Sequence, residues 1–240
     1  MEPLLIIGII LLGPVIGSFI GVARRPTDRF MLAMLAFAAG IMLAISFLQL
    51  IPEGIRMSST FLCMLGVTIG ALVMYGSDRI IPHIHPGLCK HEEGRSMQAA
   101  VAYLLIGIFL HNFPEGIAIG VGTVTTFSLS LTLAIAIAIH DIPESICTAA
   151  PYYYLTRKRL KSFLVSVAIG LPAVAGYLFA SVFFPLISQE LLGVLIGLTA
   201  GLMIYICADE LIPTSCKPGN HQTIFALVAG VLVVMVLGMI

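Results

Sequence analysis

Two short segments of the sequence combine the side chains that bind transition metals. HNFPEG occupies residues 111–116 and HDIPES occupies residues 140–145. In each segment a histidine precedes a glutamate by four positions, so a helix would place the imidazole and the carboxylate on one face. Imidazole combined with carboxylate suits Zn, Fe and Mn better than alkali metals or Cu(I). The two segments therefore predict a metal site shared by two helices.

Six residues of these segments are candidate ligands. Each segment supplies an imidazole and a carboxylate, and the residue after each histidine adds an amide oxygen or a further carboxylate if the helices face each other. A single membrane histidine is more often a packing residue, but two copies of one constellation favour coordination. The candidates are His111, Asn112, Glu115, His140, Asp141 and Glu144.

Both segments also carry a proline within the expected helix. Pro114 and Pro143 lack the backbone N–H, which predicts a kink and leaves the carbonyls of Leu110 and Ile139 without helical partners. At bilayer depth such carbonyls are tolerated where they line a cavity that holds water or an ion.

The composition places these helices in a membrane. The 240 residues are 59% hydrophobic and 10% charged, whereas soluble domains carry about 25% charged residues. The mean hydropathy of +1.09 excludes a water-soluble globule. We expect one all-α transmembrane domain over residues 1–240, because about 20 apolar residues span a bilayer. Eight stretches qualify: 3–22, 31–51, 60–80, 99–122, 128–150, 162–183, 191–212 and 223–240.

The basic residues predict the orientation. Of the twelve, only Arg56 follows an even-numbered span. The other eleven lie in connections after odd-numbered spans, and basic loops face the cytoplasm. Both termini are therefore expected outside, with a His-containing cytoplasmic loop at 81–98.

Two sequence repeats run in opposite directions. AGIM at 39–42 and LIPE at 50–53 return as AGLM at 200–203 and LIPT at 211–214, both 161 positions later, which pairs Gln49 with Glu210. The two metal segments repeat at 29 positions. Small residues recur in any membrane bundle, but the equal spacing favours an inverted 3+2+3 repeat of the kind found in secondary transporters.

Five acidic residues fall at bilayer depth, namely Glu115, Asp141, Glu144, Asp209 and Glu210. Each costs about 2.5–3.5 kcal/mol on insertion scales. No lysine or arginine shares that depth, so protonation or a bound cation must offset the charge. Asp209 and Glu210 could form a second ion-binding position or an interfacial acidic pair. We favour Glu210 as a site residue because Gln49, the equivalent residue of the repeat, is polar.

Other metal-binding side chains have simpler interpretations. Met42, Cys147 and Cys207 fit packing roles in a membrane protein that has 11 methionines and 5 cysteines. An odd number of cysteines, some of them within spans, predicts free thiols. The loop residues His83, His85, Cys89 and His91 could bind zinc weakly or form a solvated loop.

The whole chain resembles the ZIP family of metal transporters, and in particular its bacterial GufA-like branch. The resemblance rests on HNFPEGIAIG from 111, HDIPES from 140, AAGIMLA from 38 and ADELIP from 208. It implies import of zinc, or of iron, manganese or cadmium, across the inner membrane into the cytosol by alternating access. It further implies a homodimer and a binuclear centre. No organic cofactor and no nucleic-acid partner are expected.

By this resemblance the first metal position would use His111, Glu115, His140, Glu144 and Met42. The second would use Asn112, Glu115, Asp141 and Glu144, with both glutamates bridging. Two departures affect the site. Ala173 stands where relatives often place a glutamate, which removes a carboxylate from the second position. His140 stands where some relatives have glutamine, which favours Zn or Fe over Mn.

Two other functions would fit part of this pattern. An intramembrane metallohydrolase could use the same His and Glu residues with a metal-bound water, but the sequence has no HExxH pattern. A metal sensor is disfavoured because the spans leave no length for an effector domain. Transport is the function that the sequence favours.

Overall fold

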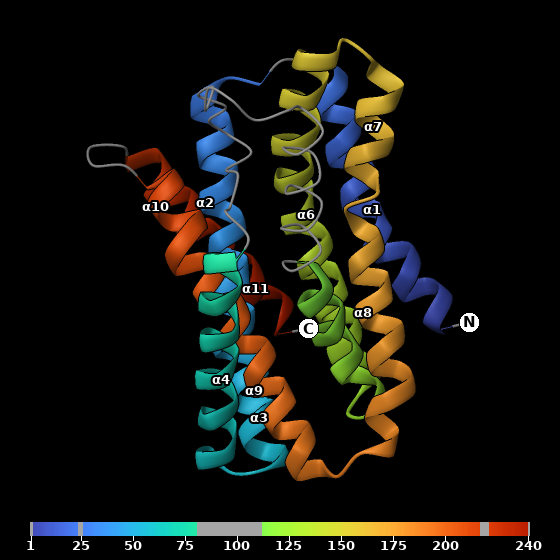
Figure 1. Ribbon diagram of the computed structural model, residues 1–240, viewed down its shortest axis with the longest axis vertical. Coiled ribbons are helices and arrows are strands. Elements are labelled where there is room, and N and C mark those ends of the chain that lie inside the picture. Colours follow the sequence, from blue (N-terminus) through green and yellow to red (C-terminus); the bar gives the residue numbers. More distant parts are fainter. Residues whose placement is uncertain (1, 24–25, 81–111, 217–220, 240) are drawn as a thin grey trace.

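The computed structural model describes residues 2–23, 26–80, 112–216 and 221–239. His111 and the loop predicted at 81–98 lie outside this part. Every regular element in the described ranges is a helix, and the helices form an elongated bundle (Figure 1). The α-helices are α1 Glu2–Ala23, α2 Asp28–Ile45, α3 Ile51–Met57, α4 Thr60–Ile80, a helix over 112–120, α6 Phe127–Thr156, α7 Arg159–Val167, α8 Gly170–Phe183, α9 Gln189–Ile206, α10 Ile212–Ser215 and α11 His221–Leu237.

Six described segments are long and apolar enough to cross a membrane. They are residues 2–23, 28–57, 60–77, 127–150, 159–186 and 189–215. The helix α11 is apolar but shorter, and the span expected at 99–122 is described only from residue 112. The all-helical membrane architecture is confirmed, and the count of eight spans stays a prediction.

The 161-residue repeat recurs in the secondary structure. The helices α2 and α9 begin at residues 28 and 189 and end at 45 and 206, so both boundaries keep the sequence offset. Each continues into a π-helical turn, η1 Ser46–Leu50 after α2 and η4 Cys207–Leu211 after α9. The two segments run in opposite directions along the bundle (Figure 1). The inverted relation predicted for this pair is therefore present in the fold.

The π-helical turns explain how both helices pass through a proline. Ile51 donates its N–H to Ser46 O and Ile212 donates to Cys207 O, five residues back in each case. Pro52 and Pro213 follow directly and cannot donate. A proline ring also clashes with the carbonyl four residues earlier in a regular α-helix, and a wider π turn relieves this crowding. The helix expected to end near residue 51 consequently continues to Met57.

Glycines allow a close helix contact near the predicted site. The helix α1 packs along α6, with Gly13 and Gly17 against the backbone carbonyls of Ala138 and Ile142. Any Cβ at either glycine would clash with those carbonyls. Small residues one turn apart allow such backbone contact in membranes. This contact fixes α6 at the level of its HDIPES segment.

Replacing Gly17 with leucine is expected to lower the melting temperature of the detergent-solubilised protein. The added side chain would meet α6 backbone, and overpacking of this kind costs about 1–3 kcal/mol. Gly8 provides a matched control on the same helix, because its Cβ position has nothing within 4 Å. Gly8→Leu should leave the melting temperature unchanged. Equal effects of both substitutions would contradict this packing role.

Candidate metal centre

Two antiparallel helices bring the metal-binding segments together. The helix over 112–120 ends in the 3-10 turn η2 Val121–Thr123, and α6 starts a few residues later. Thr126 caps α6 by accepting a hydrogen bond from Leu129 N. Ser130 Oγ then donates to Ile119 O at 2.7 Å, which ties the start of α6 to the preceding helix. The short connection forces the two helices to lie side by side.

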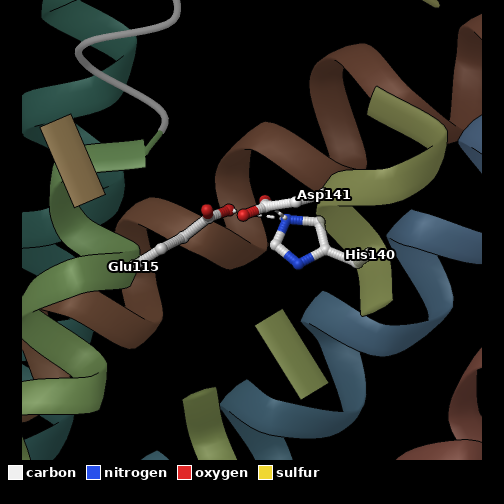
Figure 2. A group of neighbouring side chains, drawn as sticks. All are labelled: Glu115, His140 and Asp141. Atoms are coloured by element: carbon white, nitrogen blue, oxygen red, sulfur yellow. Dashed lines mark ion pairs between the residues drawn. The ribbon is translucent and has the colours of Figure 1, made fainter. Parts of the chain in front are cut away.

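Three of the predicted ligands meet in the interior. His140 Nε2 lies 3.0 Å from Glu115 Oε1 and 3.4 Å from Asp141 Oδ1. One ligand atom from each of the three residues can be chosen so that all lie within 4.8 Å of one another. Figure 2 shows Glu115 reaching from one helix toward His140 and Asp141 on the next. The donor set is two carboxylates and one imidazole, which suits a divalent transition metal.

The cluster is buried and rich in acidic groups. Glu115 and Asp141 are 0% exposed and His140 is 1% exposed. Among the described residues no lysine or arginine side chain is buried. Two carboxylates so close together repel each other unless a proton or a cation lies between them. The described surroundings thus favour a positively charged occupant.

Asn112 adds an amide next to this cluster. Its Nδ2 donates to Ile169 O at 3.0 Å, just before α8 begins, and the side chain is fully buried. Its Oδ1 accepts no hydrogen bond from the described residues, and neither Asp141 carboxylate oxygen does. Buried oxygens normally have a partner. These oxygens are therefore suited to a ligand that the described residues do not supply.

The other predicted site residues lie around the cluster. Glu144 is half-buried one turn further along α6 and is not part of the three-residue group. Met42 is fully buried on α2, which packs against α6. Glu210 is half-buried within η4. The structure brings together residues that the sequence assigned to two metal positions, since His140 belonged to the first and Asp141 to the second.

Two buried hydroxyls are not among the site residues predicted from the sequence. Ser145 follows Glu144 directly, and Ser18 lies on α1. Both side chains are 0% exposed, and neither Oγ has a hydrogen-bond partner among the described residues. Only Ser145 belongs to a motif, HDIPES, and the motif indicates a small packing residue at this position. Ser18 could not be found from spacing, because its place depends on the α1 to α6 contact.

The cysteines agree with the packing interpretation. Cys63, Cys147, Cys207 and Cys216 are free thiols. Cys147 Sγ lies 3.8 Å from Met31 O, and Cys207 Sγ lies 3.8 Å from Ala39 O. Both contacts link helices through weak thiol hydrogen bonds. Cys89 lies outside the described ranges.

Ala173 occupies a closely packed position. It is fully buried on α8, and a Cβ at Gly116 would clash with its carbonyl. The helix over 112–120 therefore contacts α8 backbone to backbone one residue from Glu115. An alanine fits this contact and brings no carboxylate to it.

Comparison with known proteins agrees with this geometry. Residues 85–238, more than half of the chain, match the family model described as ZIP Zinc transporter. The chain is 31% identical over 218 residues to the zinc transporter ZupT of Escherichia coli O7:K1, covering 87% of this chain and 85% of that protein. The zinc transporters ZupT of Escherichia coli O127:H6 and of strain K12 match with the same identity and coverage. Such similarity identifies a transporter and not a metallohydrolase, and the chain belongs to the ZIP family.

Proposed function

We propose that this protein imports divalent transition-metal ions into the cytosol across the inner membrane, with zinc as the leading ion and iron, manganese or cadmium as further candidates. The observation that carries the proposal is the buried group of Glu115, His140 and Asp141. A charged cluster inside a membrane bundle is costly and marks an ion or substrate pathway. Family membership supports the same function.

The bound ion would lie between the helix over 112–120 and α6. Asn112, Glu144 and His111 would complete its coordination, with Met42 from α2 as a soft ligand. The resemblance suggests a second ion that shares Glu115, and the lack of a carboxylate at Ala173 would make that position weaker. Homodimerisation is part of the same proposal and rests on the resemblance alone.

The distribution of basic residues supports import toward the cytosol. The α6 to α7 turn and the start of α2 lie at one end of the bundle, and α3 lies at the other (Figure 1). The first end carries Arg29 and the run from Arg157 to Lys161, whereas α3 carries Arg56. Basic residues favour the cytoplasmic side. Alternating access would then open the central site to each end in turn, as the inverted pair of α2 and α9 suggests.

Uptake of several ions into proteoliposomes tests the proposal. Purified protein in vesicles should accumulate zinc above the level of empty vesicles, and manganese should enter more slowly because imidazole favours zinc. Sodium and potassium should neither enter nor compete. The absence of uptake for every divalent ion would contradict the function. Manganese uptake faster than zinc uptake would contradict the selectivity.

A further inference from the structure

A second polar feature lies on the described helices, away from the metal centre. A cavity of about 460 Å³ is lined by Gln49 on η1, by Thr126, Ser128 and Thr132 at the start of α6, and by apolar side chains at the end of α11. Amide and hydroxyl groups of this kind bind water and hydrated cations. None of these four residues belongs to the predicted metal ligands.

Gln49 is the residue of this lining with a buried polar atom that lacks a hydrogen-bond partner among the described residues. Its Oε1 is buried and accepts no hydrogen bond from the described residues. The residue belongs to a π-helical turn, and such turns occur frequently at functional sites. Gln49 lines the cavity, and a buried amide oxygen without a partner is suited to a water or a cation. The π-helical turn thus carries an acceptor that no described residue uses.

The cavity and the metal centre share two helical segments. Gln49 follows Met42 by seven residues on the α2 segment, and Thr132 precedes His140 by eight residues on α6. At 1.5 Å per residue, both separations are about 10–12 Å along the helix axis. Because the two helices are antiparallel, both steps lead toward the same end of the bundle, where α6 begins. The cavity therefore lies at one depth, about two turns from the centre.

The repeat places an acidic residue at the matching position on the other side. Glu210 occupies in η4 the position that Gln49 occupies in η1. It follows Met203 by the same seven residues, on a helix that runs in the opposite direction. The centre is consequently flanked by a neutral amide toward one end and by a carboxylate toward the other. An ion moving from the amide to the centre would therefore exchange a weak neutral ligand for carboxylate and imidazole ligands.

We propose that the cavity beside Gln49 is an outer waiting site, where a partly hydrated divalent cation exchanges one water for the Gln49 amide oxygen before it reaches the metal centre. This inference rests on the proposed function and adds a residue that controls entry. A neutral ligand suits this place, because a site on a conduction path must bind an ion and also release it. Gln49 acts on the encounter step and not on the coordination at the centre.

Substitutions of opposite character at Gln49 test the inference in proteoliposomes. Gln49→Leu removes the acceptor, and loss of one hydrogen-bond-strength contact should raise the KM for zinc uptake about three- to tenfold. Gln49→Glu supplies a charge and should lower that KM. The maximal rate of Gln49→Leu should stay within about twofold of the unaltered protein, since the change affects capture of the ion and not its translocation. Phe47→Leu is the matched control, because Phe47 is 54% exposed on the same turn and does not line the cavity.

Equilibrium metal content and thiol labelling separate this inference from the proposed function. Detergent-solubilised Gln49→Leu should retain the zinc content of the unaltered protein. Gln49→Cys should react with a charged, membrane-impermeant thiol reagent added from outside, above the background of the unaltered protein. An unchanged KM in Gln49→Leu, a loss of bound zinc, or labelling from the cytoplasmic side alone would overturn the waiting site. Failure of the unaltered protein to take up any metal would overturn the proposed function, whereas outside labelling of Gln49→Cys would still support an open outer cavity.

Discussion

Glu115→Gln is expected to reduce zinc uptake by more than about 100-fold while the protein still inserts and folds. Glutamine keeps the size of the side chain but removes the charge that faces His140 at 3.0 Å and shares the cluster with Asp141. Loss of a residue that only supports a ligand costs about 10- to 100-fold in metal affinity, so loss of a direct carboxylate ligand should exceed that range. Uptake into proteoliposomes and bound zinc per protein are the measurements.

Glu53→Gln is the matched control for this charge removal. Glu53 lies on α3, where it pairs with Arg56 at 2.8 Å, and Arg56 is exposed. Surface ion pairs contribute about 0–1 kcal/mol, so uptake should hardly change. An unaltered elution profile and melting temperature would show that Glu115→Gln is folded. Zinc uptake retained in that folded variant would contradict the assignment of Glu115 as a ligand.

His140→Gln is expected to lower zinc uptake about 10- to 100-fold, less than Glu115→Gln because the glutamine amide oxygen remains as a weaker ligand, and to lower manganese uptake much less. The imidazole is the nitrogen ligand that the described cluster contributes. Nitrogen ligands favour zinc, whereas carboxylate and amide oxygens suit manganese. The ratio of zinc to manganese uptake should therefore fall. Parallel initial rates for the two ions in the same vesicles give this ratio directly.

His221→Gln makes the same chemical change at an exposed position. His221 begins α11 and is open to solvent. Its substitution should leave both rates and their ratio unchanged. A zinc to manganese ratio that is equal in His140→Gln and in the unaltered protein would remove the imidazole from the selectivity mechanism. His140→Ala should lower uptake of both ions, because it also opens a cavity in the cluster.

The repeat could be predicted from the sequence because it preserves both residue type and spacing. AGIM and LIPE return as AGLM and LIPT at one offset, and the helices α2 and α9 keep that offset at both of their boundaries. The π-helical turns at Ser46–Leu50 and Cys207–Leu211 were not predicted. The spans expected from the sequence ended at residues 51 and 212, directly before the prolines that follow these turns. The local sequence does not reveal that one turn of the helix widens and that the helix then continues past the proline.

The types of ligand could also be predicted from the sequence, but their grouping in space could not. Helical spacing paired His140 with Glu144, because i and i+4 share a face. In the structure His140 instead contacts Glu115 and its own neighbour Asp141, while Glu144 is half-buried beyond the three-residue group. Side chains on one helix face need not converge on one point. Their direction depends on how α6 is rotated against the preceding helix and against α1.

The sequence by itself determined the membrane environment, the helical class, the inverted pair of helices and the residue types of the metal centre. Each of these follows from composition or from spacing within one helix, which are local properties. Only the tertiary structure decided that Glu115, His140 and Asp141 meet, that Asn112 is held by Ile169 O, and that Gln49 borders a cavity. These depend on contacts between helices far apart in the chain, such as the glycine contact of α1 with α6. Backbone approach of that kind is set by the packing of several helices at once, and no single segment encodes it.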